Sequence, residues 1–172
     1  MLQLTFTAEP DAPSLVRAVS AYQQLWAAEG ERILDRIETL TGLRFAERRM
    51  SARVLEGPSR SHPLVLRASY DDDTKLATLV HELLHRVLST GGTDRPASRE
   101  GQESLREHEL VDLFLFDAWT DLYGEDFARR HVERESQLRP MYGEAWKRTL
   151  LMDRSARSAR GQTLVQSRRP PH

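Results

Sequence analysis

Residues 71–89 of this chain, DDDTKLATLVHELLHRVLS, have the pattern of an amphipathic helix that packs against a core. Three aspartates precede Thr74, where carboxylates can cap free amide groups and complement the positive end of a helix dipole, so we expect a helix over residues 74–89. His81 and His85 lie on the side of this helix where side chains can face a cleft. At about 100° per residue, the other side collects the apolar residues Leu76, Leu79, Val80, Leu83, Leu84 and Val87.

The two histidines of this helix are spaced to bind one metal ion. Residues four apart lie one turn above each other, so the imidazoles of His81 and His85 can reach the same ion. The chain has no cysteine, which leaves His, Asp and Glu as ligands, and Zn2+ is the expected cofactor. Zinc lowers the pKa of a bound water, and Glu82 is the catalytic residue expected to accept the proton of that water.

A catalytic zinc ion takes three protein ligands and keeps one position for water, so a third ligand is needed. A second apolar helix is predicted over residues 104–123. Its inward face carries His108, which we predict as the third metal ligand, and Glu109 at the edge of that face is the alternative. Asp112 also faces inward and needs a partner. We expect Asp112 to accept a hydrogen bond from the far nitrogen of a ligand histidine, with an ion pair to an arginine as the alternative.

The HELLH sequence on a helix, with a third ligand on a later helix, resembles the zincin group of metallopeptidases. The metzincin branch is excluded because it requires Gly and His where this chain has Leu88 and Gly91. The gluzincin branch would use Glu109 as third ligand and the SprT-like branch a histidine such as His108, so both branches stay open. The resemblance implies a zinc-dependent peptidase acting on a peptide or protein substrate. It also implies that a strand beside the active-site helix, here residues 63–70, aligns the substrate backbone.

The remaining periodicities predict an α+β fold, with a small, mostly antiparallel sheet packed on the active-site helix and a mainly helical C-terminal half. The pattern changes from alternation typical of strands to three- and four-residue spacing typical of helices. Strands are predicted over residues 2–7, 44–50, 52–55 and 63–70, and further helices over residues 14–40, 125–138 and 141–152.

We predict a single zincin-like metallohydrolase domain over residues 1–153 and a basic, flexible tail over residues 154–172. The tail contains five arginines and no acidic residue. A non-catalytic, metal-containing domain that binds a partner or nucleic acid through this tail is therefore the alternative hypothesis. No segment is apolar enough to predict a membrane helix, and a cytoplasmic location is expected. The oligomeric state has no signature in the sequence.

Overall fold

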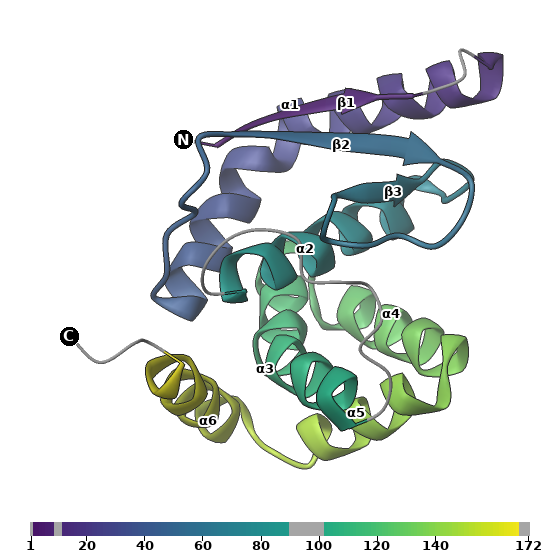
Figure 1. Cartoon of the computed structure of the whole chain (residues 1–172). Coiled ribbons are helices and arrows are strands. Elements are labelled where there is room, and N and C mark those ends of the chain that lie inside the picture. The colour runs from purple at the N-terminus through teal and green to yellow at the C-terminus, as the bar shows by residue number, and fades with distance from the viewer. Residues whose placement is uncertain (1, 9–11, 90–101, 169–172) are drawn as a thin grey trace.

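The computed structural model describes residues 2–8, 12–89 and 102–168, and it has the predicted α+β architecture (Figure 1). Its elements follow the chain in the order β1 (Gln3–Thr7), α1 (Pro13–Thr41), β2 (Arg49–Leu55), β3 (Val65–Arg67), α2 (Asp72–Leu88), α3 (Gln102–Tyr123), α4 (Glu125–Leu138), α5 (Pro140–Leu150) and α6 (Arg154–Ser167). The helices α1 to α5 lie close to the five helical ranges that the sequence predicted. The two middle strand candidates are replaced by the single strand β2, and the last candidate shortens to β3.

The three strands form one parallel sheet in the order β1-β2-β3, so the prediction of a mostly antiparallel sheet is wrong. Between β1 and β2 the chain passes through the 29-residue helix α1. A crossover of this length returns the chain to the end of the sheet where β1 began, and the two strands then pair in parallel, with Gln3 opposite Arg49. Apolar residues alternate in the same way in both types of sheet, so the sequence pattern did not reveal the strand direction.

Strand β3 is bordered on its outer edge by the segment that precedes it. Arg60 pairs antiparallel with Val65, and each of the two donates its amide to the carbonyl of the other, at 3.0 and 2.9 Å. The amide of Arg67 donates to Ser59 Oγ at 3.1 Å, and the carbonyl of Arg67 accepts from the Tyr22 hydroxyl at 2.9 Å. The outward backbone groups of Val65 and Arg67 are therefore all hydrogen-bonded within the chain.

The core lies between the sheet and the helices, with α1 and α2 packed against one face of the sheet (Figure 1). Every second residue of β1 and β2 is buried there, and the apolar side of α2 is buried as predicted. None of the helices in the described part of the chain is long and apolar enough to span a membrane. The core includes Leu4, Phe6, Met50, Ala52 and Val54 from the strands, Tyr22, Ile33 and Ile37 from α1, and Leu79, Val80, Leu83, Leu84 and Val87 from α2.

The predicted flexible tail is largely a helix, α6, that packs on α1 and α3. Arg157 is buried and donates to both carboxylate oxygens of Asp117 on α3, at 3.2 and 2.6 Å. Arg154 pairs in the same way with Asp121, one turn further along α3. These pairs neutralise two of the five arginines of the segment, and residues up to the end of α6 form a packed helix where a flexible tail was predicted. Residues 169–172 lie outside the described residues.

Candidate metal centre

Helix α2 positions two of the three predicted metal ligands. Its N-terminus is capped by Asp71, whose side chain accepts from the Thr74 amide at 2.8 Å, as the three aspartates predicted. The buried leucines and valines hold the helix against the core. His81 and His85 are half-buried on its other side, and the side chain of Glu82 between them is almost fully buried, with 8 % of the residue exposed.

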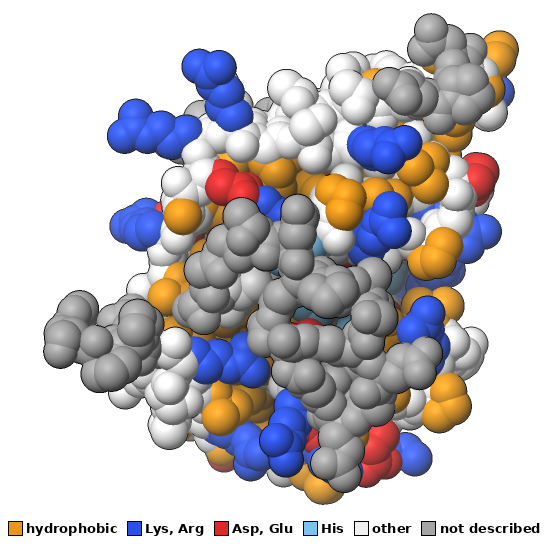
Figure 2. All heavy atoms as spheres, viewed as in Figure 1, with side chains coloured by type: hydrophobic (Ala, Val, Ile, Leu, Met, Phe, Trp, Pro, Cys, Tyr) orange, Lys and Arg blue, Asp and Glu red, His pale blue; other side chains and the backbone are white. Residues whose placement is uncertain are grey.

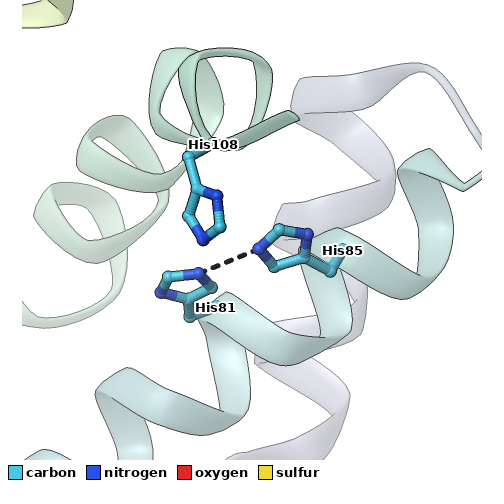
Figure 3. A group of neighbouring side chains, drawn as sticks. All are labelled: His81, His85 and His108. Atoms are coloured by element: carbon cyan, nitrogen blue, oxygen red, sulfur yellow. Dashed lines mark hydrogen bonds between the residues drawn. The ribbon is translucent and has the colours of Figure 1, made fainter. Parts of the chain in front are cut away.

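Helix α3 brings His108 to the same place. The indole of Trp119 on α3 donates to the carbonyl of Ala77 on α2 at 3.2 Å, which fixes the two helices against each other. The three imidazoles converge, with ring centroids 4.9 Å apart for His81 and His85, 5.0 Å for His85 and His108, and 6.0 Å for His81 and His108 (Figure 3). Two of the rings come from one helix and the third approaches from the other.

The nitrogen atoms of these histidines lie close enough together to serve as ligands of one metal ion. Among the described residues, His81, His85 and His108 form the one group of His, Cys, Asp and Glu side chains able to hold a metal ion, with ligand atoms all within 4.8 Å of one another. The Nε2 atoms of His81 and His85 are 3.0 Å apart. Zinc bonds to nitrogen are about 2.0–2.1 Å long, so two ligands of a tetrahedral ion are separated by about 3.3 Å. Small side-chain movements would bring all three nitrogens to that distance, and three imidazoles are a donor set that suits zinc.

The alternative third ligand, Glu109, is turned away from this cluster. Its carboxylate pairs with Arg148 on α5 at 2.6 Å and does not belong to the group of potential ligands. The structure thus brings His108, and not Glu109, together with the two histidines of α2.

The hydrogen bond expected for Asp112 is made by a different carboxylate. Glu135 on α4 lies 2.6 Å from Nδ1 of His81, and the other oxygen of Glu135 accepts from the indole of Trp146 on α5 at 3.1 Å. Asp112 is 1 % exposed, and its Oδ1 has no hydrogen-bond partner among the described residues. Neither of the two roles expected for Asp112, a bond to a ligand histidine or an ion pair with an arginine, is found in the described part of the chain.

The protonation states of the site follow from burial and from the close charges. Burial lowers the pKa of His81, but Glu135 and the other nearby carboxylates outweigh this effect and raise the pKa to about 9. Burial and the neighbouring histidines hold the pKa of His85 well below its usual value. In the metal-free protein His81 is therefore protonated at neutral pH and can donate to Nε2 of His85. Metal binding has to displace that proton.

Glu82 has the electrostatic properties of a general base. Burial raises the pKa of its carboxyl group to about 7, against the opposing effect of the His81 charge. A carboxylate whose pKa is near the working pH can both accept and release a proton during a reaction.

Tyr142 of α5 also contacts the site, although the sequence did not single it out. Its ring packs on His108 with centroids 4.5 Å apart. Burial raises the pKa of the phenol, and the nearby carboxylates of Glu135 and Glu82 add to this shift, so the hydroxyl stays protonated at neutral pH.

In Figure 2, histidine side chains are visible near the middle of the face shown, with arginine and lysine side chains around them.

The strand expected to align a substrate is next to the site, but its outer edge is occupied. The turn before β3 contacts the C-terminal end of α2, where Ser89 Oγ lies 3.1 Å from Nε2 of His62. The backbone groups of Val65 and Arg67 that an extended peptide would use are bonded to Arg60, Ser59 and Tyr22. A peptide can pair with this edge only if residues 59–60 move aside.

The residues that the sequence did not reveal carry a weak signal in hindsight. Glu135 follows Ala128, His131 and Val132 on the buried stripe of α4, where an acidic side chain needs a partner. Trp146 lies on the buried stripe of α5. Periodicity alone could thus have marked Glu135 as a buried charge, but it could not have identified His81 as its partner.

No protein-family model, curated protein or solved structure matches this chain. The resemblance carried by His81, Glu82 and His85 is accordingly local, and the chemistry of the site follows from the geometry of this chain.

Proposed function

We propose that this protein is a zinc-dependent peptidase in which His81, His85 and His108 hold the metal and Glu82 is the general base. The observation that carries the proposal is the convergence of three imidazoles from two helices beside a buried glutamate. Three protein ligands leave one coordination position for water or substrate, whereas a purely structural zinc site closes all four with protein groups. When bound, zinc lowers the pKa of a water towards neutrality and polarises a substrate carbonyl.

Glu82 supports a catalytic reading because a structural metal site has no use for it. Its carboxyl group is buried beside His81, and its pKa of about 7 allows it to take the proton of the attacking water. The same group then delivers the proton to the leaving amine, which completes hydrolysis of an amide bond.

Tyr142 supports the proposal through the contact of its ring with that of His108. Its protonated phenol is a hydrogen-bond donor held against a ligand ring. A donor in this place can stabilise the negative charge that develops on the carbonyl oxygen during attack. The SprT-like, three-histidine type of zincin is therefore the branch that this chain resembles more closely, because Glu109 is engaged by Arg148.

The proposal is tested by metal analysis and by cleavage of an unfolded protein substrate, with wild type beside the Glu82→Gln variant. Wild type is expected to carry about one zinc ion per chain and to cleave, and Glu82→Gln is expected to keep the zinc but lose activity by about 10²–10⁴-fold. Glu144→Gln, on the exposed surface of α5, is the matched control. A wild type without zinc, or a Glu82→Gln variant that cleaves as well as wild type, would disprove the proposal.

A further inference from the structure

A chain of two hydrogen bonds joins three helices behind the candidate ligand His81. The indole Nε1 of Trp146 donates to Glu135 Oε2 at 3.1 Å, and Glu135 Oε1 lies 2.6 Å from His81 Nδ1. Trp146 is 1 % exposed, and the side chains of His81 and Glu135 are 13 % and 15 % exposed. The arrangement is therefore shielded from water, and its geometry is set by the packing of α4 and α5 on α3 and on each other.

The donors and acceptors of this chain leave one consistent arrangement. An indole N–H can only donate, so Glu135 Oε2 must accept. A carboxylate has acceptors only, so its Oε1 accepts the Nδ1 proton of His81, and 2.6 Å is the short distance of a charge-assisted bond. The lone pair of His81 available to a metal is then the one on Nε2. That atom lies 3.0 Å from Nε2 of His85, on the side of the cluster where the three imidazoles converge.

We propose that Trp146 and Glu135 act together as positioning residues that keep the His81 proton on Nδ1 and present Nε2 to the metal. Trp146 matters because its N–H holds Oε2 of Glu135 and so keeps Oε1 directed at His81. Asp112 does not substitute for this role, because its buried Oδ1 makes no hydrogen bond among the described residues. The inference rests on the metal-binding half of the proposed function and is independent of the peptidase reaction.

Glu135→Gln is the sharpest single test. A glutamine side chain has one acceptor oxygen and one donor nitrogen. Because Trp146 still donates, the amide oxygen must face Trp146 and the amide nitrogen must face His81. The amide then donates to Nδ1, which moves the His81 proton to Nε2 and blocks the metal ligand. We expect zinc affinity, measured by chelator competition, to fall by about 100-fold, at the upper end of what outer partners of ligand histidines contribute.

Removing the indole donor in the same background should reverse part of this loss. In Glu135→Gln/Trp146→Phe the amide is free to turn, so that its oxygen can accept from His81 Nδ1 again. We expect zinc affinity about tenfold higher than in Glu135→Gln alone, although two native contacts are missing. Trp119→Phe is the matched control, since Trp119 is equally buried but donates to the Ala77 carbonyl, and it should give no recovery.

The outcomes separate this inference from the proposed function. A wild-type protein that binds no zinc overturns both. Wild type that binds zinc with the affinity of Glu135→Gln, or a double variant no better than Glu135→Gln, overturns only the inference about Trp146 and Glu135. If the Trp146 variant does not fold, NMR of the zinc-loaded protein decides. A one-bond hydrogen–nitrogen correlation from His81 Nδ1 is expected in wild type, and its absence there overturns the inference.

Discussion

Raising the pH of the metal-free protein should destabilise it through His81. Burial lowers the pKa of His81, but Glu135 together with Glu82 and Asp112 outweighs this effect, and the pKa is raised from 6.5 to about 9 in the folded protein. The folded state therefore binds this proton more tightly than the unfolded state. The stabilisation is fully present below pH 6.5 and is lost as the pH rises through 9.

The size of this effect follows from the two pKa values. Between pH 7 and pH 9, His81 should lose about 2 kcal/mol of its contribution to the free energy of unfolding. For a domain of this size that corresponds to a decrease in Tm of about 4–8 °C. Glu82 also makes the folded protein less stable as the pH rises. The pKa of its carboxyl group is raised to about 7, so its contribution is lost at a lower pH than that of His81. The metal-free protein should thus be more stable near pH 6 than near pH 9.

The assay is thermal unfolding in the presence of a chelator at several pH values from 6 to 9.5, for wild type and His81→Gln. The difference between the two curves isolates the His81 contribution and should shrink by about 2 kcal/mol between pH 7 and pH 9. Zinc-loaded wild type should show no such loss, because the metal takes the place of the proton and binds more tightly as the pH rises. A difference that stays constant, or that grows with pH in metal-free protein, would refute the assignment of the proton to His81.

Three further variants test the rest of the site and the fold. Asp112→Asn should change zinc affinity less than Glu135→Gln and should stabilise the metal-free protein at pH 8 by about 1 kcal/mol, because burial raises the pKa of the Asp112 carboxyl group and its ionisation opposes folding, whereas an amide does not ionise; a lower Tm would contradict this. Tyr142→Phe should lower kcat about 10–100-fold with zinc affinity unchanged, whereas Tyr123→Phe should have no effect on kcat. Gly161→Ala should cost about 1–3 kcal/mol in urea unfolding, because its Cβ would lie 2.5 Å from Phe114 Cζ; a neutral result would show that α6 does not pack there.

The contacts that the sequence predicted best are those set by local geometry. His81 and His85 share a helix, so the spacing of four residues alone placed their rings together. The apolar stripe of α2 had to face the core, which left both histidines on the other side. His108 was selected by the same reasoning applied to α3, and it is the residue that the structure brings to the cluster.

The strand direction and the C-terminal helix were mispredicted for reasons that are not local. Whether neighbouring strands run parallel depends on where the chain re-enters the sheet, and the crossover through α1 decided that. Arg154 and Arg157 look like a solvated charge run in sequence, but Asp121 and Asp117 on a distant helix pair with them. Arg157 and Asp117 are 40 residues apart in the chain, and a charge pattern does not reveal a partner at that distance.

By itself, then, the sequence determined that His81, Glu82 and His85 share one helix whose apolar side is buried, because helix periodicity and hydrophobic burial act over a few residues. It also reduced the third ligand to His108 or Glu109. Only the tertiary structure brings His108 beside the other two histidines, pairs Glu109 with Arg148, and supplies Glu135, Trp146 and Tyr142. Those side chains reach the histidines because α4 and α5 pack against α3, and that packing depends on the shape of the whole core.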